Sequence, residues 1–333
     1  MKILAYVHFY LPTHMSGGEV YLHRFLKGLN RDKDITVMIE ASENKSYIYD
    51  GIKVVETNDP NSMYNILHHD LIITHLNYTA RVTAYCKEAN KKVINIFHSH
   101  DTSFPDAYKD DNVIKIFNSE YVFNACQSAC HNHKIKNKFI LHPFIDFEKY
   151  NKYKHENING REYITFVNPI YIKGPDVVGE LAKKYPEKKF LIVKGGYYKD
   201  AQQFDLFKKL SNCHIVENTK HMIKNVYLKS RVVIQPSRVE TYGMVAAEAQ
   251  AMGIPVIANK EGQGLVENLG KMCLYGITPQ HSDANQYNIE EYCKCIDMLD
   301  DLPTYILWSK HSEEYRKEQC EIQKKEFSLV KSL

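Results

Sequence analysis

The sequence predicts an α/β protein with two domains of similar size, each built on a parallel sheet between helices. Three observations support this prediction. The chain has 333 residues, which is more than one ordinary hydrophobic core accommodates. Short apolar runs alternate with stretches of helical periodicity, as in parallel strands joined by crossover helices. Residues 146–161 interrupt this alternation with a polar segment, as expected of a connection between domains.

The first Rossmann-like domain is expected over residues 1–150. Its strands are short and rich in Ile, Val and Phe, and its helical stretches repeat apolar residues at helical spacing. The expected strands are residues 3–9, 35–39, 71–74, 93–97, 113–118 and 139–141, and the expected helices are residues 19–29, 79–89 and 119–129.

The second Rossmann-like domain is expected over residues 151–307. Its expected strands are residues 163–167, 190–193, 214–216, 232–235 and 255–258, and its expected helices are residues 175–184 and 243–252. The tail is predicted to be helical, with a break at Pro303 and with Trp308 as an apolar anchor. The last helix, residues 308–333, is expected to pack back on the first domain.

Composition and charge narrow the function classes. Hydrophobic residues make up 44% and charged residues 25% of the chain, and the net charge is +3, so nothing demands a nucleic-acid partner. No secretory signal, membrane span or disulfide framework is recognisable, and the eight scattered cysteines are expected to be reduced. We therefore expect a cytoplasmic protein. A peripheral contact with the cytoplasmic membrane face, through Lys134, Lys136 and Lys138, is the alternative.

The most informative segment is residues 232–258, where a buried strand leads through a loop into a helix and a second buried strand. The helix is expected to begin near Gly243, so its unpaired amides and positive dipole end lie at the carboxyl edge of the sheet, where a phosphate can bind. Glu240 precedes the helix and Glu248 lies about two turns inside it. Each carboxylate can accept hydrogen bonds from hydroxyl groups.

With its flanking Pro-Ser, Thr-Tyr-Gly and Gly-Ile-Pro-Val-Ile residues, this segment resembles the E-x7-E region of glycosyltransferase family 4, the glycosyl transferases group 1. The resemblance implies the GT-B fold, in which two Rossmann-like domains face each other across a cleft. It also implies a retaining glycosyltransferase that moves a sugar from a UDP- or GDP-sugar to a hydroxyl of a glycan or lipid-linked acceptor. The acceptor is expected mainly on the first domain and the nucleotide on the second, without a metal or cofactor.

The resemblance also implies residue roles within the segment. Glu248 would bind the donor ribose, and Glu240 would bind the hydroxyls of the transferred sugar as a catalytic group. The remaining donor-binding residues would be those at the helix start, namely Thr241, Tyr242, Gly243 and Met244.

By the same resemblance, Lys173 would meet the β-phosphate and stabilise the leaving group as the glycosidic bond breaks, so it is both a catalytic and a donor-binding candidate. Family members usually carry an Arg a few residues upstream, whereas this chain has Asn168 there. Either Asn168 donates a neutral hydrogen bond or Lys173 acts alone. A catalytically silent subunit that binds a nucleotide or glycan is therefore the alternative function.

Two sites in the first domain complete the predicted donor site. Gly17 and Gly18 lie in a strand-to-helix turn that, by the resemblance, closes over the donor phosphates. His98 follows a buried strand directly and is the catalytic candidate that contacts the donor sugar. A zinc site made by His98, His100 and Asp101 is the alternative at this position.

Other patterns carry weaker signals. Asp32-Lys33-Asp34 has the D-x-D spacing of a metal site but is expected in a solvated turn. A zinc site from Cys126, Cys130, His131 and His133 is an alternative to two half-buried cysteines on a helix. No G-x-G-x-x-G follows a strand, which disfavours a nicotinamide-dependent oxidoreductase. The acceptor loops, expected at residues 58–64, 77 and 103–111, carry no readable code.

Overall fold

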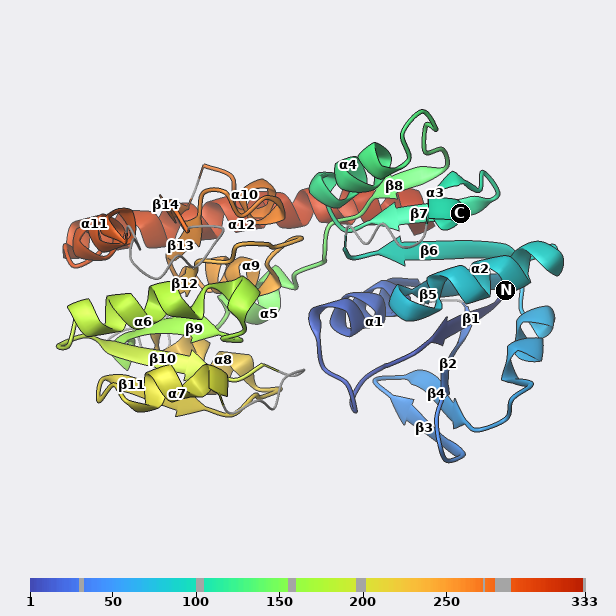
Figure 1. Ribbon diagram of the computed structural model, residues 1–333, viewed down its shortest axis with the longest axis horizontal. Helices are drawn as coiled ribbons and strands as arrows, with labels where there is room; N and C mark the ends of the chain where they lie inside the picture. Colours follow the sequence, from blue (N-terminus) through green and yellow to red (C-terminus); the bar gives the residue numbers. More distant parts are fainter. Residues whose placement is uncertain are drawn as a thin grey trace. The chain divides into compact units, whose positions relative to one another are not determined.

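The computed structural model describes residues 1–29, 33–99, 105–154, 160–195, 202–271, 273–278 and 289–331. The chain divides into two compact units. Unit 1 comprises Met1–Phe144 and Gln323–Leu333, and unit 2 comprises Ile145–Ile322. Each unit consists of a sheet flanked by helices (Figure 1).

The described part of unit 1 contains an eight-stranded sheet in the order β3-β4-β2-β1-β5-β6-β7-β8. Its strands are β1 (Lys2–Val7), β2 (Asp34–Glu40), β3 (Lys45–Tyr49), β4 (Ile52–Thr57), β5 (Leu71–His75), β6 (Lys92–Phe97), β7 (Val113–Phe117) and β8 (Lys138–Ile140). The helical elements are α1 (Gly17–Leu29), η1 (Ser62–His68), η2 (Leu76–Tyr78), α2 (Thr79–Glu88), α3 (Pro105–Lys109) and α4 (Glu120–Ala129).

The hairpin of β3 and β4 is absent from the sequence prediction. β3 runs antiparallel to β4 at the edge of the sheet, and its residues are exposed or half-buried. Such a strand lacks the continuous apolar run that marks a buried parallel strand. The local signal was the turn, since Asp50-Gly51 joins the two strands with φ of 48° and 80°, the left-handed conformations that favour Asp-Gly in a two-residue hairpin.

Both faces of the unit 1 sheet are covered. Ile3, Ala5 and Val7 of β1 pack with Leu22 and Leu26 of α1 in one core cluster. Leu4 and Tyr6, which point to the opposite face, pack with Val82 and Cys86 of α2. This alternation fixes the register of β1, because a slip by one residue would exchange the two faces.

Unit 2 contains, among the described residues, a six-stranded parallel sheet in the order β11-β10-β9-β12-β13-β14. The strands are β9 (Tyr163–Val167), β10 (Lys189–Val193), β11 (Cys213–Val216), β12 (Ser230–Gln235), β13 (Val256–Asn259) and β14 (Leu274–Gly276). The helical elements are α5 (Phe147–Asn151), η4 (Tyr171–Lys173), α6 (Pro175–Lys184), α7 (Gln202–Lys208), α8 (Met222–Asn225), η5 (Tyr227–Lys229), α9 (Met244–Ala251), α10 (Gly264–Leu269), α11 (Glu290–Met298) and α12 (Leu302–Lys331), whose residues from Gln323 onward belong to unit 1.

The strand order of unit 2 is that of a Rossmann fold, with the chain running outward from β9 in one direction and then from β12 in the other. Ligands of such sheets bind at the carboxyl ends of the two strands where the order reverses. The loops that follow β9 and β12 are therefore the places where a site is expected.

The tail forms two helices, α11 and α12, and Pro303 is the second residue of α12, where it is tolerated because the first turn needs no amide donor. Trp308 is partly buried against the core cluster that α11 shares with the unit 2 sheet. The predicted fold class, two α/β units with parallel sheets, is confirmed, with one antiparallel edge strand added.

Candidate active site

The loop between β12 and α9 carries the E-x7-E motif. Gly243 is the N-cap of α9 and has φ of 88°, a conformation that strongly favours glycine. A Cβ at this position would also lie 2.5 Å from Cδ1 of Leu265. The helix starts at Met244, so the amides of its first turn are at the carboxyl edge of the sheet, where they favour an anionic group.

Glu240 lies in this loop and contacts Lys173, which ends η4 after β9. The Nζ of Lys173 donates to Oε2 of Glu240, and Nε2 of Gln235 donates to the same oxygen at 2.7 Å. The structure thus brings together residues from the loops after β9 and β12, as the strand order requires.

Glu248 is buried within α9, with 8% of its surface exposed. The hydroxyl of Tyr227, in η5, donates to its Oε2 at 2.9 Å. Tyr227 is itself fully buried, so its hydroxyl needs this acceptor. The contact holds the Glu248 carboxylate in position within α9.

Arg238 connects the two loops and was missed in the sequence analysis. Its backbone amide donates to the carbonyl of Ile172 at 2.8 Å, and its guanidinium forms a two-pronged ion pair with Asp176, with the Nη2 to Oδ2 distance 2.6 Å. The side chain is only 2% exposed, so it is a structural tie for the segment that carries Lys173. Its signal in the sequence was a charged residue directly after a buried strand and Pro-Ser.

Two glycines allow neighbouring loops to pack closely against the segment from Pro236 to Thr241. Gly174 has φ of 74°, and a Cβ there would lie 2.4 Å from the carbonyl oxygen of Pro236. Gly264 likewise allows close contact, since its Cβ would lie 2.2 Å from the carbonyl oxygen of Thr241. Both glycines are needed because larger residues would push the neighbouring loops apart.

Asn168 follows β9 directly and has φ of 61°. Its backbone N–H donates to the carbonyl of Val193 at 2.8 Å, and its side-chain Oδ1 is buried without a hydrogen-bond partner among the described residues. Gly195 leaves space for this oxygen, because a Cβ at Gly195 would lie 1.9 Å from it. The backbone conformation accounts for Asn at this position, since Asn is among the residues that adopt left-handed φ most readily.

In unit 1, Gly17 and Gly18 form the first turn of α1. A Cβ on Gly18 would lie 3.6 Å from Cδ2 of His98, so the glycine turn and His98 are neighbours. Nδ1 of His75 and Nε2 of His98 are 3.1 Å apart. Burial lowers the pKa of His98 to about 3 and that of His75 well below its usual value, so this pair is uncharged at neutral pH.

Each unit has a cavity among its described residues. A cavity of about 40 Å³ in unit 1 lies at the carboxyl ends of β5 and β6, and its lining includes Asn77 and His98. A larger cavity of about 210 Å³ in unit 2 includes Glu162, Lys189 and Arg231 in its lining. These three residues lie at the amino ends of the strands, away from Glu240 and Lys173, so the larger cavity belongs to the edge opposite the candidate site.

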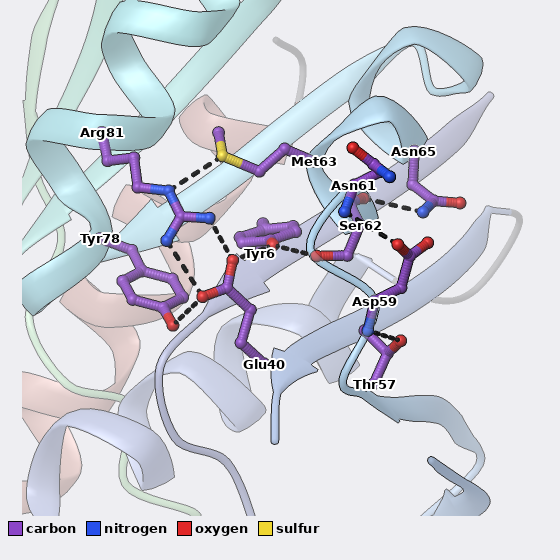
Figure 2. Close-up of polar contacts among 10 residues, drawn as sticks. All are labelled: Tyr6, Glu40, Thr57, Asp59, Asn61, Ser62, Met63, Asn65, Tyr78 and Arg81. Carbon is purple, nitrogen blue, oxygen red and sulfur yellow. Dashed lines mark hydrogen bonds and ion pairs between the residues drawn. The ribbon is translucent and has the colours of Figure 1, made fainter. Parts of the chain in front are cut away.

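A second carboxylate cluster lies at the carboxyl end of β2 in unit 1 (Figure 2). The carboxylate of Glu40 accepts from the hydroxyl of Tyr6 at 2.5 Å, from the hydroxyl of Tyr78 at 2.8 Å and from both Nη atoms of Arg81. Tyr6 also contacts Ser62 of η1 at 2.7 Å. The Arg81 guanidinium lowers the pKa of Glu40 to about 2, and burial raises the pKa of Tyr78 to about 12. No sequence pattern pointed to this cluster.

No metal-binding group was found in the part of the chain that the structure describes, where no three His, Cys, Asp or Glu side chains lie together suitably. Cys126 and Cys130 are buried in the core, so the zinc site considered for them with His131 and His133 is not formed. No disulfide joins the cysteines that the structure describes. His100, Asp101 and Asp32 lie outside the described residues.

Comparison with protein families shows that residues 129–271 match the family described as Glycosyl transferases group 1. The D-inositol 3-phosphate glycosyltransferase of Mycolicibacterium smegmatis is 27% identical over 139 residues, covering 37% of this chain and 32% of that protein. An uncharacterized glycosyltransferase of Haemophilus influenzae is 26% identical over 244 residues, covering 70% of this chain and 58% of that protein. These matches thus span less than two thirds of the relatives' own lengths.

Among solved structures, Anabaena HepE in complex with UDP and glucose matches with a TM-score of 0.79 and 16% identity, covering 100% of both chains. The two α/β units with parallel sheets match the fold of GT-B glycosyltransferase structures. Within the sequence, the similarity to the glycosyl transferases group 1 family is carried by residues 129–271. Of the helices that the structure describes, none is both long and apolar enough to cross a membrane.

Proposed function

We propose that the protein transfers a glycosyl group from a UDP-sugar to a hydroxyl of a glycan or lipid-linked acceptor, with retention of the anomeric configuration. The observation that carries this proposal is the convergence of Lys173, Glu240 and the start of α9 at the carboxyl ends of β9 and β12. A cation, a helix start and a carboxylate together suit a sugar diphosphate.

The nucleotide is assigned from the solved relative. HepE is described in complex with UDP and with UDP-glucose, and its fold matches this chain over its full length. Glu248, held by Tyr227 inside α9, would accept hydrogen bonds from the ribose hydroxyls. Loop residues 241–244 would contact the diphosphate at the start of the helix.

Transfer would break the bond between the anomeric carbon and the β-phosphate oxygen while the acceptor oxygen bonds to the same carbon. The proton of the acceptor hydroxyl would pass to the departing phosphate on the same face. Lys173 would stabilise the charge that develops on this phosphate, and Glu240 would orient the sugar through its hydroxyls. Asn168 would add a neutral hydrogen bond where relatives carry a cation.

Residues 1–150 would bind the acceptor and residues 151–307 the donor nucleotide. In the first of these segments, His98 would contact the donor sugar in its uncharged form, and Gly17 and Gly18 would cover the diphosphate. We place the enzyme in the cytoplasm, where UDP-sugars are its donors, with peripheral membrane contact when the acceptor is lipid-linked. This contact would use the basic segment around Lys134, Lys136 and Lys138.

The proposal includes no requirement for a divalent metal, because Lys173 and the amides at the start of α9 supply positive charge to the diphosphate. The test is a thermal-shift measurement with UDP-, GDP- and ADP-sugars in EDTA, followed by an assay of nucleotide release. Stabilisation by a UDP-sugar with release of UDP in EDTA is the expected result. Stabilisation without nucleotide release, whichever acceptor is added, would favour the catalytically silent subunit. Stabilisation by a GDP-sugar alone would show that the donor nucleotide is GDP and not UDP.

A further inference from the structure

Three side chains form a hydrogen-bonded chain next to the start of α9. Lys173 and Gln235 both donate to Oε2 of Glu240, and neither contact uses Oε1. The chain is largely removed from water, since the side chains of Lys173 and Glu240 are 19% and 11% exposed and Gln235 is 8% exposed. An ion pair with so little solvent contact is screened far less than one on the surface.

In this arrangement the ion pair competes with the roles proposed for its members, phosphate binding by Lys173 and sugar binding by Glu240. Lys173 cannot give its full charge to a diphosphate while it neutralises Glu240, and Glu240 cannot offer Oε2 to a sugar hydroxyl while that oxygen holds both donors. A diphosphate that takes the full charge of Lys173 must therefore open the pair. The Glu240 carboxylate competes with the diphosphate for the same ammonium group.

Gln235 is the second donor to Glu240. Because a carboxylate only accepts hydrogen bonds, the amide nitrogen of Gln235 must face Glu240, and its Oε1 must point elsewhere. That Oε1 is buried and has no hydrogen-bond partner among the described residues. An unpaired buried carbonyl oxygen is costly, and a hydroxyl group of a ligand would satisfy it.

Two more unpaired oxygens lie at the same strand ends. Oγ of Ser237, after β12, and Oδ1 of Asn168, after β9, are also buried without a partner in the described part of the chain. The amide of Gln235 also lies close to the helix start, since a Cβ on Gly243 would be 3.4 Å from its Nε2. Unpaired acceptors therefore gather where β9 and β12 end, at the proposed donor site.

We infer that the Lys173–Glu240 pair is a lock that the donor diphosphate opens, and that Gln235 is a further donor-binding residue. In the free protein the pair neutralises both charges. The diphosphate draws Lys173 away, Gln235 keeps Glu240 in position, and Oε1 of Gln235 accepts a hydrogen bond from a hydroxyl of the donor sugar. This inference rests on the proposed function.

The first test measures the affinity for UDP, which has the diphosphate but no sugar, by calorimetry. Glu240→Gln is expected to bind UDP about tenfold more tightly than the unmodified protein, because Lys173 no longer has to leave a carboxylate. In a Lys173→Met background the same substitution is expected to leave UDP affinity unchanged. A gain of affinity is not the result of damage to the fold, so it separates the lock from a merely structural role.

The second test compares UDP with UDP-glucose. Gln235→Met keeps the volume and removes the amide, so UDP-glucose affinity is expected to fall about tenfold while UDP affinity stays the same. Equal losses for both ligands would show that Gln235 supports the loop rather than the sugar, and would overturn its assignment as a donor-binding residue.

The matched control is Glu162→Gln. Glu162 pairs with Lys189 at 2.7 Å at the amino ends of β9 and β10, on the opposite edge of the same sheet, and its substitution is expected to leave UDP affinity unaltered. Tight UDP binding by the unmodified protein with no gain in Glu240→Gln would overturn the lock and leave the proposed function standing. No UDP binding by the unmodified protein would overturn the assigned donor and the lock together.

Discussion

Glu40 in unit 1 and Glu240 in unit 2 both lie at the carboxyl edge of a parallel sheet, and both pair with a cation. Their surroundings differ. Both oxygens of Glu40 are used, each by a tyrosine hydroxyl and an Nη of Arg81. The two hydrogen bonds described for Glu240 fall on one oxygen, beside other buried acceptors that lack partners among the described residues.

The difference favours a structural role for Glu40 and agrees with the binding role proposed for Glu240. A saturated carboxylate joins segments of the chain, and Glu40 links β2 to β1, η2 and α2 through Tyr6, Tyr78 and Arg81. A carboxylate with spare acceptor capacity is available to a ligand. Substitutions at Glu40 should therefore change stability, and substitutions around Glu240 should change binding and turnover.

The largest expected effect is on turnover. Lys173→Ala should lower kcat about a hundredfold, because the charge on the departing phosphate loses the cation that stabilises it. Steady-state assays of UDP release would measure this, with Lys189→Ala at the opposite edge of the sheet as the control. If kcat stayed within about twofold of the unmodified value, Lys173 would not be the group that stabilises the leaving phosphate.

The next effect is on stability. Glu40→Ala should lower the free energy of unfolding by about 2 kcal/mol, because the buried hydroxyl of Tyr6 and the guanidinium of Arg81 lose their acceptor. Urea denaturation would measure the change, and calorimetry should find UDP affinity unaltered. A loss of UDP affinity without a loss of stability would reverse the roles assigned to the two carboxylates.

A somewhat smaller effect is expected on nucleotide affinity. Glu248→Ala should weaken UDP binding about tenfold, because charged hydrogen bonds to the ribose are lost. Tyr227→Phe, which removes only the hydroxyl that holds Glu248, should weaken it less, and calorimetry with both variants provides the comparison. Unchanged UDP affinity in Glu248→Ala would contradict the ribose assignment.

The smallest effect concerns pH. The folded pKa of Glu40 is lowered to about 2 from the ordinary 4.5, so its contribution to stability is fully present above about pH 4.5 and is lost as the pH falls towards 2. The difference in unfolding free energy between the unmodified protein and Glu40→Gln should therefore shrink across this window. Denaturation at about pH 6, 4 and 2.5 would measure it, and a constant difference would assign the stabilisation to uncharged contacts.

The sequence predicted the sheets and the motif because both depend on local patterns. Alternating strands and helices are legible in short windows, and the residues from Glu240 to Glu248 are neighbours along the chain. The hairpin of β3 and β4 was missed because β3 is an edge strand without a buried face on each side.

The Glu40 cluster and the lock were not predictable in this way. Tyr6, Glu40 and Tyr78 are separated by more than thirty residues from one another, and no short window contains two of them. Gln235 and Lys173 are likewise far apart in sequence, and only the parallel pairing of β9 with β12 brings their loops together. Contacts of this kind depend on topology rather than on local composition.

Arg316 stabilises the loop before α9 and is synthesised after it. This fully buried side chain of α12 bonds to Gln250, to Asn268 and to the hydroxyl of Tyr242, and Asn268 in turn bonds to the carbonyls of Tyr242 and Gly243. Residues 240–268 are synthesised before residue 316. During synthesis the loop from Glu240 to Gly243 therefore gains its contacts to Arg316 only after α12 has been made and has packed against unit 2. The proposed nucleotide site is complete only from that point.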